Sequence, residues 1–294
     1  MSSKYKITHR TSYWYEANVS ASYGRMRLLP RDLARQTCLE SSISVDPSPG
    51  DHSQYLDLFG NRVDYVSIHD PHRTLSITAE SIVEVQAAPP LPLAGNVSWE
   101  SVRDGIGRIG GDEDVLAVQF SLDSPMVEAS EAFEAYARPS FTAGRPVVEA
   151  VLDLSSRIHR DFEFSQSATS VDTPIEQVLE QRKGVCQDFA HVGIACLRSM
   201  GLPARYVSGY LETDPPPGGV RLVGADVSHA WLSAFVPGAG WIDVDPTNDQ
   251  VPGHRHIVTA FGRDYTDVSP FSGVIYTRGR TSSLEVVVDV LGLE

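Results

Sequence analysis

The hydrophobic pattern of this chain changes its period twice, and the order of those changes limits the folds that the chain can adopt. Apolar side chains alternate with polar ones in short runs over residues 1–88, recur every three or four positions over residues 146–201, and return to strand-like runs over residues 204–290. A period of two is typical of half-buried strands, and the longer period is typical of amphipathic helices. Because strands and helices fall into separate blocks, the sequence predicts an α+β fold.

The strand-like first block is predicted to be a domain of its own. Short strands separated by turn residues are typical of a small sandwich, so residues 1–88 are expected to form an N-terminal β-sandwich-like domain. Prolines at positions 89, 90 and 92 cannot continue a strand ladder and indicate a boundary. Residues 89–144 are expected to be a mostly helical or irregular connector, and residues 145–294 to be the second domain.

The connector contains a glycine-rich stretch that resembles a phosphate loop. Gly105, Gly107 and Gly110 have the spacing GxGxxG. That spacing indicates nucleotide binding only where a strand leads into it, and no strand is predicted before these glycines. A bound nucleotide is therefore not expected.

The charge balance excludes two classes of partner. The chain has 294 residues, of which 38 are acidic and 24 are basic, and it contains no run of Lys or Arg. Nucleic acid and anionic membranes both require a basic surface, so neither is an expected partner. The three cysteines are too few and too widely spaced for a disulfide framework, and the N-terminus lacks the apolar segment of a signal peptide. A cytoplasmic protein is expected.

One cysteine stands at a position that favours chemistry. The pattern predicts a helix from Cys186 to Met200, with Gly193 and neighbouring alanines allowing it to lie close to a sheet. A thiol at the start of a helix faces unpaired N–H groups, which favour the thiolate and can stabilise an oxyanion. Most free cysteines are small core residues instead, and Cys196, in the middle of the same helix, is expected to be one.

A nucleophilic cysteine needs a base and a group that orients the base. His229 lies in a predicted strand, with Trp231 on the same face, and a predicted hairpin returns the chain through Asp243 and Asp245. Asp245 can meet His229 only if the strands pair odd to odd, which requires an odd-length loop, such as five residues, or a bulge. Asp245 is the predicted orienter, and Asp243 has the same parity and remains a rival.

The remaining histidines have weaker claims to the base. His191 lies about 140° around the predicted helix from Cys186, so it cannot turn back to the sulfur and is expected to be structural. His254 and His256 follow the acidic turn and are expected to be solvated. No CxxC or HxxxH spacing is present, so a zinc site is not expected.

Three segments together resemble a known family. The stretches GVCQDFAH, SHAW and WIDVDPTN, in that order, are similar to motifs of the transglutaminase-like superfamily, and in particular of its bacterial two-domain group with an N-terminal β-domain. Supporting similarities cover nearly the whole chain and fall at Tyr5–Tyr15, Arg27–Pro30, Asp57–Asn61, Gly201–Tyr206 and Gly262–Tyr265.

The resemblance implies a papain-like or transglutaminase-like core, in which a central helix bearing the cysteine packs on an antiparallel sheet. It implies a triad of Cys186, His229 and Asp245 that transfers an acyl group from a peptide or protein amide through a thioester. Gln187 is a candidate oxyanion donor, and neither a metal nor a cofactor is expected. Hydrolysis is favoured because water is abundant. Amine transfer, as in a transglutaminase, and a non-catalytic scaffold that retains the fold remain open.

Overall fold

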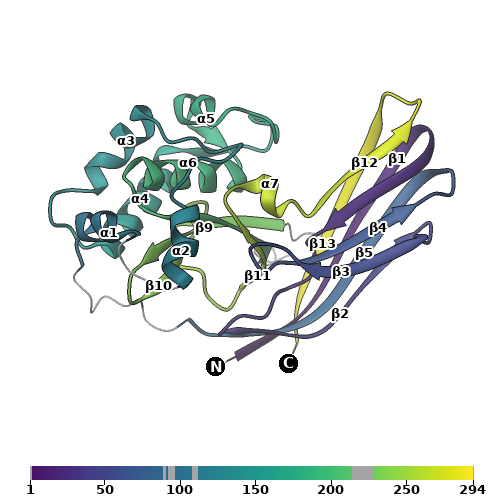
Figure 1. Ribbon diagram of the computed structural model, residues 1–294, viewed down its shortest axis with the longest axis horizontal. Coiled ribbons are helices and arrows are strands. Elements are labelled where there is room, and N and C mark those ends of the chain that lie inside the picture. The colour runs from purple at the N-terminus through teal and green to yellow at the C-terminus, as the bar shows by residue number, and fades with distance from the viewer. Residues whose placement is uncertain (1, 89–90, 92–96, 108–111, 214–227, 294) are drawn as a thin grey trace, which may run out of the picture.

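The computed structural model describes residues 2–88, 91, 97–107, 112–213 and 228–293. The proline-rich boundary, apart from Leu91, and Gly110 of the glycine-rich stretch lie outside the described residues. Within them the chain has the α+β architecture that the sequence predicts, with a sheet-rich region beside a helical core (Figure 1). No helix in the described part of the chain combines the length and apolar character needed to cross a membrane.

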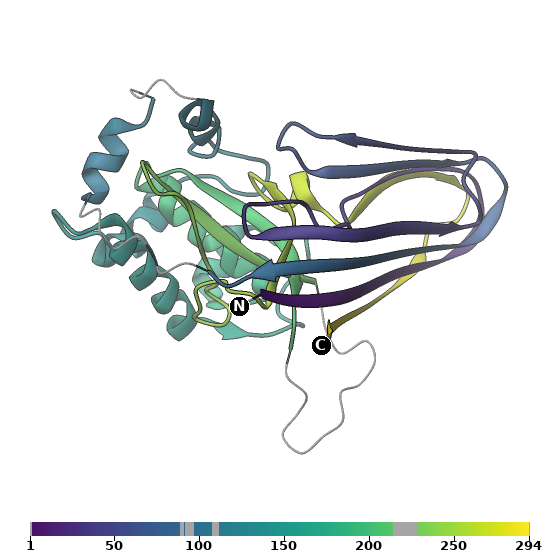
Figure 2. The same cartoon turned by 90° about the horizontal axis from the view of Figure 1, so that it is seen from below.

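The sheet-rich region is a seven-stranded antiparallel sheet organised by one long strand, β1. The first part of β1 pairs with β5 and β13, and its last part pairs with β4 and β12. The strands curve into two layers that enclose a shared apolar core (Figure 2). Its strands are β1 (Ser2–Met26), β2 (Gln36–Asp46), β3 (Asp51–Leu56), β4 (Arg62–Ile68), β5 (His72–Gln86), β12 (Phe271–Thr277) and β13 (Ser282–Leu293).

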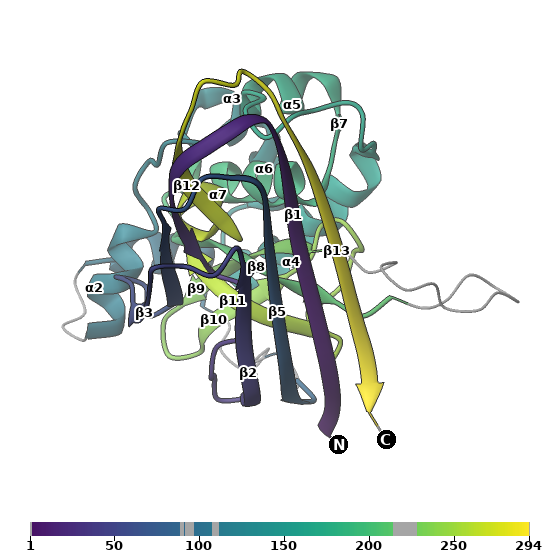
Figure 3. The same cartoon turned by 90° about the vertical axis from the view of Figure 1, so that its right-hand side faces the viewer.

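The last two strands of the chain therefore belong to the sheet where the chain begins. Figure 3 shows β13 running beside β1 along its length, with both termini at the same end. The sequence assigns these strands to the second domain, residues 145–294, whereas in the structure they pair with β1. Strand pairing across such a separation leaves no local signal, because period-two alternation shows that a strand exists and not which strand it pairs with.

The core has a four-stranded antiparallel sheet in the order β10-β9-β8-β11, with helices around it. The sheet consists of β8 (Ala204–Leu211), β9 (Ser228–Val236), β10 (Gly240–Val244) and β11 (His256–Gly262). Two short strands, β6 (Glu163–Phe164) and β7 (Lys183–Gly184), pair in parallel beside it. The helices are α1 (Trp99–Gly105), α2 (Asp112–Gln119), α3 (Glu131–Ala137), α4 (Val147–Asp161), α5 (Ile175–Gln181), α6 (Cys186–Ser199) and α7 (Tyr265–Val268), with one 3₁₀ turn at Arg138–Ser140.

Helix α6 is the centre of the core, as the sequence predicts. Every side chain from Asp188 to Arg198 is buried, and the helix packs on β9 and β8 and against α3. Gly193 allows this close approach, because a Cβ added there would lie 2.2 Å from Leu232 Cδ2 on β9. The helix ends at Ser199 with Met200 as its C-cap, and Gly201 follows with a φ of +75°, which fits the predicted glycine stop.

The two regions are joined by polar as well as apolar contacts. Asn61, in the turn before β4, donates from Nδ2 to the Phe261 carbonyl at 2.7 Å and accepts from the Phe261 N–H at 2.8 Å. Tyr210 on β8 donates to the Leu28 carbonyl at 2.8 Å. A buried apolar cluster drawn from β1, β5, β13, β8 and β11 fills the space between them. The N-terminal sheet is thus anchored directly to the core sheet.

We expect Gly193→Ala to destabilise the protein, because the neighbouring Leu232 is 1% exposed and would have to shift against the other side chains of the main core. Overpacking of this kind costs about 1–3 kcal/mol and outweighs the roughly 1 kcal/mol that alanine gains in a helix. Urea denaturation measures the difference. Gly253→Ala is the control, because nothing lies within 4 Å of the added Cβ. Equal stability of the two variants would contradict the close packing of α6 on β9.

Candidate active site

Cys186 is the first residue of α6 and lies half-buried at the edge of the main core. Asp188, in the first turn, accepts a hydrogen bond from the Val185 N–H at 2.8 Å and another from Thr169 Oγ1 at 2.7 Å. Gly184 permits this cap, since a Cβ there would lie 2.5 Å from Asp188 Oδ2. The thiol therefore stands at a capped helix start, beside first-turn N–H groups that have no partner within the helix.

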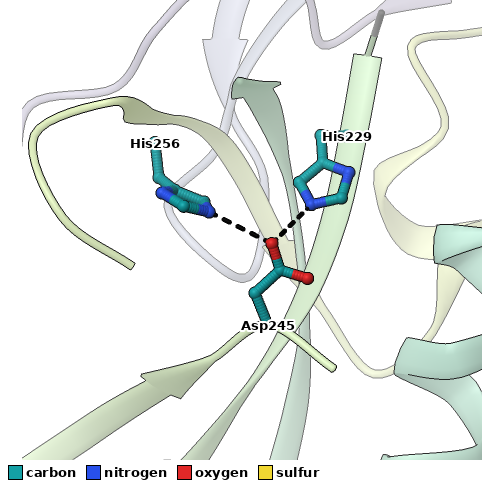
Figure 4. A group of neighbouring side chains, drawn as sticks. All are labelled: His229, Asp245 and His256. Atoms are coloured by element: carbon teal, nitrogen blue, oxygen red, sulfur yellow. Dashed lines mark hydrogen bonds and ion pairs between the residues drawn. The ribbon is translucent and has the colours of Figure 1, made fainter. Parts of the chain in front are cut away.

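The predicted hairpin brings His229 and Asp245 together. The loop between β9 and β10 covers residues 237–239, and pairing of Leu232 with Val244 keeps odd residues opposite odd ones. The loop is thus odd in length, as the interaction requires, although shorter than the five residues expected. Asp245 follows β10, and its Oδ2 accepts a hydrogen bond from His229 Nε2 at 2.8 Å (Figure 4). The other ring nitrogen of His229, Nδ1, remains for the thiol.

The Asp245 carboxylate is fully buried and saturated with donors. Beyond His229, its Oδ2 accepts from Asn248 Nδ2 at 2.8 Å and from His256 Nε2 at 3.2 Å. Its Oδ1 accepts from the N–H groups of Thr247 at 2.9 Å and Asn248 at 3.3 Å. Carboxylates that accept several hydrogen bonds stay ionised. This one therefore presents a fixed negative charge to the His229 ring.

The two pKa shifts at this pair have clear causes. Burial favours a higher pKa for Asp245, but the hydrogen bonds from His229, His256 and Asn248 outweigh burial and lower it. Burial alone would lower the pKa of His229, whereas its hydrogen bonds and charge interactions with Asp245 and Cys186 raise it to about 10. His229 is therefore an imidazolium at neutral pH. Acylation of the sulfur removes one of the two groups that hold the proton on His229.

His256 is a site residue that the sequence did not reveal. It was expected to be solvated, as His254 is, but it is 5% exposed, begins β11 and bonds to the orienting carboxylate. Figure 4 shows both histidine rings turned toward one oxygen of Asp245. The available signal was the strand-like run that starts at His256. The expectation failed because the local sequence around His256 does not show where β11 lies in the sheet, and that position decides whether His256 is buried.

Asp243, the rival orienter, lies elsewhere. It sits opposite Ser233, which donates a hydrogen bond to its carboxylate, and it also interacts with Arg205. Ser233 is four residues along β9 from His229, or about 13 Å at the usual rise of a strand. The two aspartates have the same parity, so it is their distance from His229 along the strand that decides which of them orients the ring.

The other singled-out residues have separate positions. Gln187 Nε2 donates to the Val171 carbonyl at 3.4 Å, so its amide is directed at the loop before α5. His191 is buried and accepts from the Tyr265 N–H at 3.1 Å, which fits the structural role expected of it. Cys196 is fully buried, as expected, and burial raises the pKa of its thiol above the ordinary range.

One group at this site has the spacing of metal ligands. One atom from each of His229, Asp245 and His256 lies within 4.8 Å of the others. All three atoms already share hydrogen bonds, however, and an ion placed among them would displace the bond that orients His229. The geometry is thus better suited to an orienting network than to a metal centre.

Comparisons with known proteins place this site in a family context. The sequence model described as the bacterial transglutaminase-like N-terminal region matches residues 5–84, and that of the transglutaminase-like superfamily matches residues 134–246. An uncharacterized protein of Mycobacterium tuberculosis is 46% identical over 298 residues, covering 99% of this chain and 93% of its own length. A protein-glutamine gamma-glutamyltransferase of Pseudomonas aeruginosa is 31% identical over 125 residues, which cover 42% of this chain and 18% of the relative.

A solved structure shares the fold. The crystal structure of a proposed cysteine protease from Cytophaga hutchinsonii superimposes with a TM-score of 0.73 at 22% identity, and the match covers 98% of this chain and 91% of that one. The shared fold therefore extends over both regions of the chain.

We expect His256→Leu to slow alkylation of Cys186 by iodoacetamide at neutral pH by about fivefold, the effect of losing one hydrogen bond worth roughly 1 kcal/mol. The loss loosens Asp245 and, through it, His229. His256→Gln, which can place an amide donor near the position of Nε2, should recover much of the rate. Peptide mass mapping follows Cys186 separately from Cys196. Wild-type rates in a folded His256→Leu protein would contradict the positioning role.

Proposed function

The chain belongs to the transglutaminase-like superfamily, and we propose that it is a thiol enzyme that transfers an acyl group from a peptide or protein amide. The observation that carries this proposal is the arrangement of Cys186, His229 and Asp245. A thiol at a helix start, a histidine whose pKa is raised and a buried carboxylate bonded to its Nε2 are the parts that cysteine acyl transfer requires.

The first half of the reaction forms a thioester. The Cys186 thiolate attacks the amide carbonyl carbon, and the electrons of the C=O bond move to the oxygen, where N–H groups at the start of α6 can stabilise them. As the C–N bond breaks, the His229 imidazolium gives its Nδ1 proton to the leaving amine. Asp245 holds the ring in this orientation throughout, since Nε2 donates to its Oδ2 at 2.8 Å.

The second half returns the enzyme to its starting state. With Cys186 acylated, neutral His229 takes a proton from a water or a primary amine as it attacks the thioester carbonyl. Collapse releases the acid or the new amide, and the sulfur leaves as the thiolate beside the imidazolium. We propose hydrolysis as the principal outcome, because water is the abundant nucleophile.

Amine transfer is the second candidate outcome. The name of the Pseudomonas aeruginosa relative, a protein-glutamine gamma-glutamyltransferase, favours it. A non-catalytic scaffold is the third candidate. A scaffold, however, has no need for a buried carboxylate that accepts five hydrogen bonds, one of them from His229.

We expect mass spectrometry of the protein incubated with a peptide library and a primary amine to show Cys186-dependent products. A gain of water at an amide marks hydrolysis, and addition of the amine marks transfer. Cys186→Ala should abolish both and leave the melting temperature nearly unchanged, because the thiol is only half-buried. Cys196→Ala, the matched control, should retain turnover per folded molecule and lose about 1 kcal/mol of stability. Identical product profiles for wild type and Cys186→Ala would sink the proposal.

We expect Asp245→Asn to lower turnover on the order of 100-fold or more, because His229 loses its orienting acceptor and counter-charge. The pKa of His229, raised above 6.5 to about 10, should fall, so the imidazolium is lost at a lower pH. The alkaline limb of the Cys186 alkylation profile should therefore move to lower pH. Asp243→Asn is the control and should leave both readouts unchanged. A larger effect from Asp243→Asn, with both variants folded, would reverse the assignment of the orienter.

A further inference from the structure

A cleft of about 770 Å³ lies where the core meets the N-terminal sheet. Its walls come from residues 125–128, from the loop that leads into α5, from α7 and from the start of β12. Figure 1 shows α7 between the core helices and β12, with α5 above. Its lining includes Met126, Val171, Asp172, Glu176, Tyr265 and Phe271.

Two of these residues connect the cleft to the reactive thiol. Val171 accepts the hydrogen bond from Gln187, the residue that follows Cys186. On the other side, the Tyr265 ring packs edge-on against the Tyr206 ring, with 6.4 Å between centroids. Tyr206 is itself buried, and its ring lies close enough to Cys186 and Tyr265 for their charges to add to the rise in its pKa that burial causes. The cleft wall at Val171 is therefore hydrogen-bonded to the first turn of α6, beside the thiol.

The N-terminal sheet helps to shape the cleft. Phe271 begins β12, which pairs with the end of β1, and its ring packs over Gly24. A Cβ at Gly24 would lie 2.4 Å from the Phe271 ring, so glycine is needed for the ring to hold this position. On the core side, Asp264 caps α7 and accepts from the Met126 N–H at 2.9 Å, which ties two walls together.

The lining combines an apolar surface with one sign of charge. Met126, Ile175, Tyr265 and Phe271 supply apolar contact area, and the lining contains no Lys, Arg or His. Glu128, Asp172 and Glu176 are exposed carboxylates, and among the described residues none of the three has an ion-pair partner. A ligand that packs on this apolar surface would lie next to carboxylates that no ion pair neutralises. A positive group on the ligand would therefore be favoured.

We propose that this cleft binds the segment of a peptide substrate that flanks the reacting amide, and that it selects a Lys or Arg next to a bulky apolar residue. The inference rests on the proposed thiol chemistry for the direction of the peptide toward Cys186. The apolar side chain packs between α5, α7 and β12, and the cationic side chain lies at the rim near Asp172 and Glu176. The N-terminal sheet acts in substrate selection, because it supplies the Phe271 wall.

Peptide binding to the Cys186→Ala protein tests the cleft without turnover. Two fluorescein-labelled peptides share a central glutamine flanked by leucine and differ only in the next residue, Lys or Glu. Fluorescence anisotropy should give a Kd about tenfold lower for the Lys peptide, and added salt should reduce the difference, since exposed charge pairs are each worth up to about fivefold and are screened. A third peptide, with Ser in place of Leu beside Lys, should bind about tenfold more weakly than its Leu counterpart.

Matched charge variants locate the preference. Asp172→Asn combined with Glu176→Gln should bring the two Kd values within about threefold of each other, since two exposed charge pairs are removed. Asp51→Asn combined with Glu149→Gln removes two exposed carboxylates that do not line the cleft and should leave the ratio at its original value. Equal binding of the Lys and Glu peptides, or an equal effect of both double variants, would overturn the proposal.

The outcome separates this inference from the proposed function. Charge-selective binding without any Cys186-dependent product would retain the cleft as a peptide site and remove the thiol chemistry. Turnover by the wild-type protein with no preference between the Lys and Glu peptides would retain the chemistry and overturn the cleft.

Discussion

The buried carboxylate of Asp245 is the interaction on which the rest of the site depends. It is 0% exposed and would be costly without partners, so the surrounding chain supplies them: β9 gives His229, β11 gives His256, and the turn after β10 gives Asn248 and backbone N–H groups. Helix α4 also contacts this turn, because His159 Nδ1 lies 3.0 Å from the Thr247 carbonyl oxygen. One ion thus fixes the relative positions of two strands, a turn and a helix.

Helix α6 brings the nucleophile to that ion. Close packing sets its distance from the sheet, because Gly193 lets the helix backbone approach Leu232 on β9, the strand that also carries His229. Packing on one strand therefore fixes both the thiol and its base. Asp188 completes the arrangement by capping the first turn of the helix. It accepts the hydrogen bond from the Val185 N–H, so the chain before Cys186 is fixed by a contact that does not involve the thiol.

The N-terminal sheet is part of the same mechanical unit. Asn61 pairs with the backbone of Phe261 at the end of β11, and Asp264, three residues further along, caps α7. The motifs around Asp57–Asn61 and Gly262–Tyr265, recognised in the sequence as family features without a role, thus connect the sheet to the wall of the cleft. They act by positioning backbone, which explains why no reactive side chain marks them.

The local sequence by itself determined several elements and three of the interacting residues. Hydrophobic period, glycine stops and helix-start chemistry predicted α6, the β9–β10 hairpin and the parity that allows Asp245 to meet His229, because each depends on residues close in the chain. Only the tertiary structure decided the rest. His256 reaches Asp245 through β11, which is placed by its pairing with β8, and β12 and β13 join the first strand of the chain. Pairing between distant strands depends on the packing of the whole fold, and no local pattern records it.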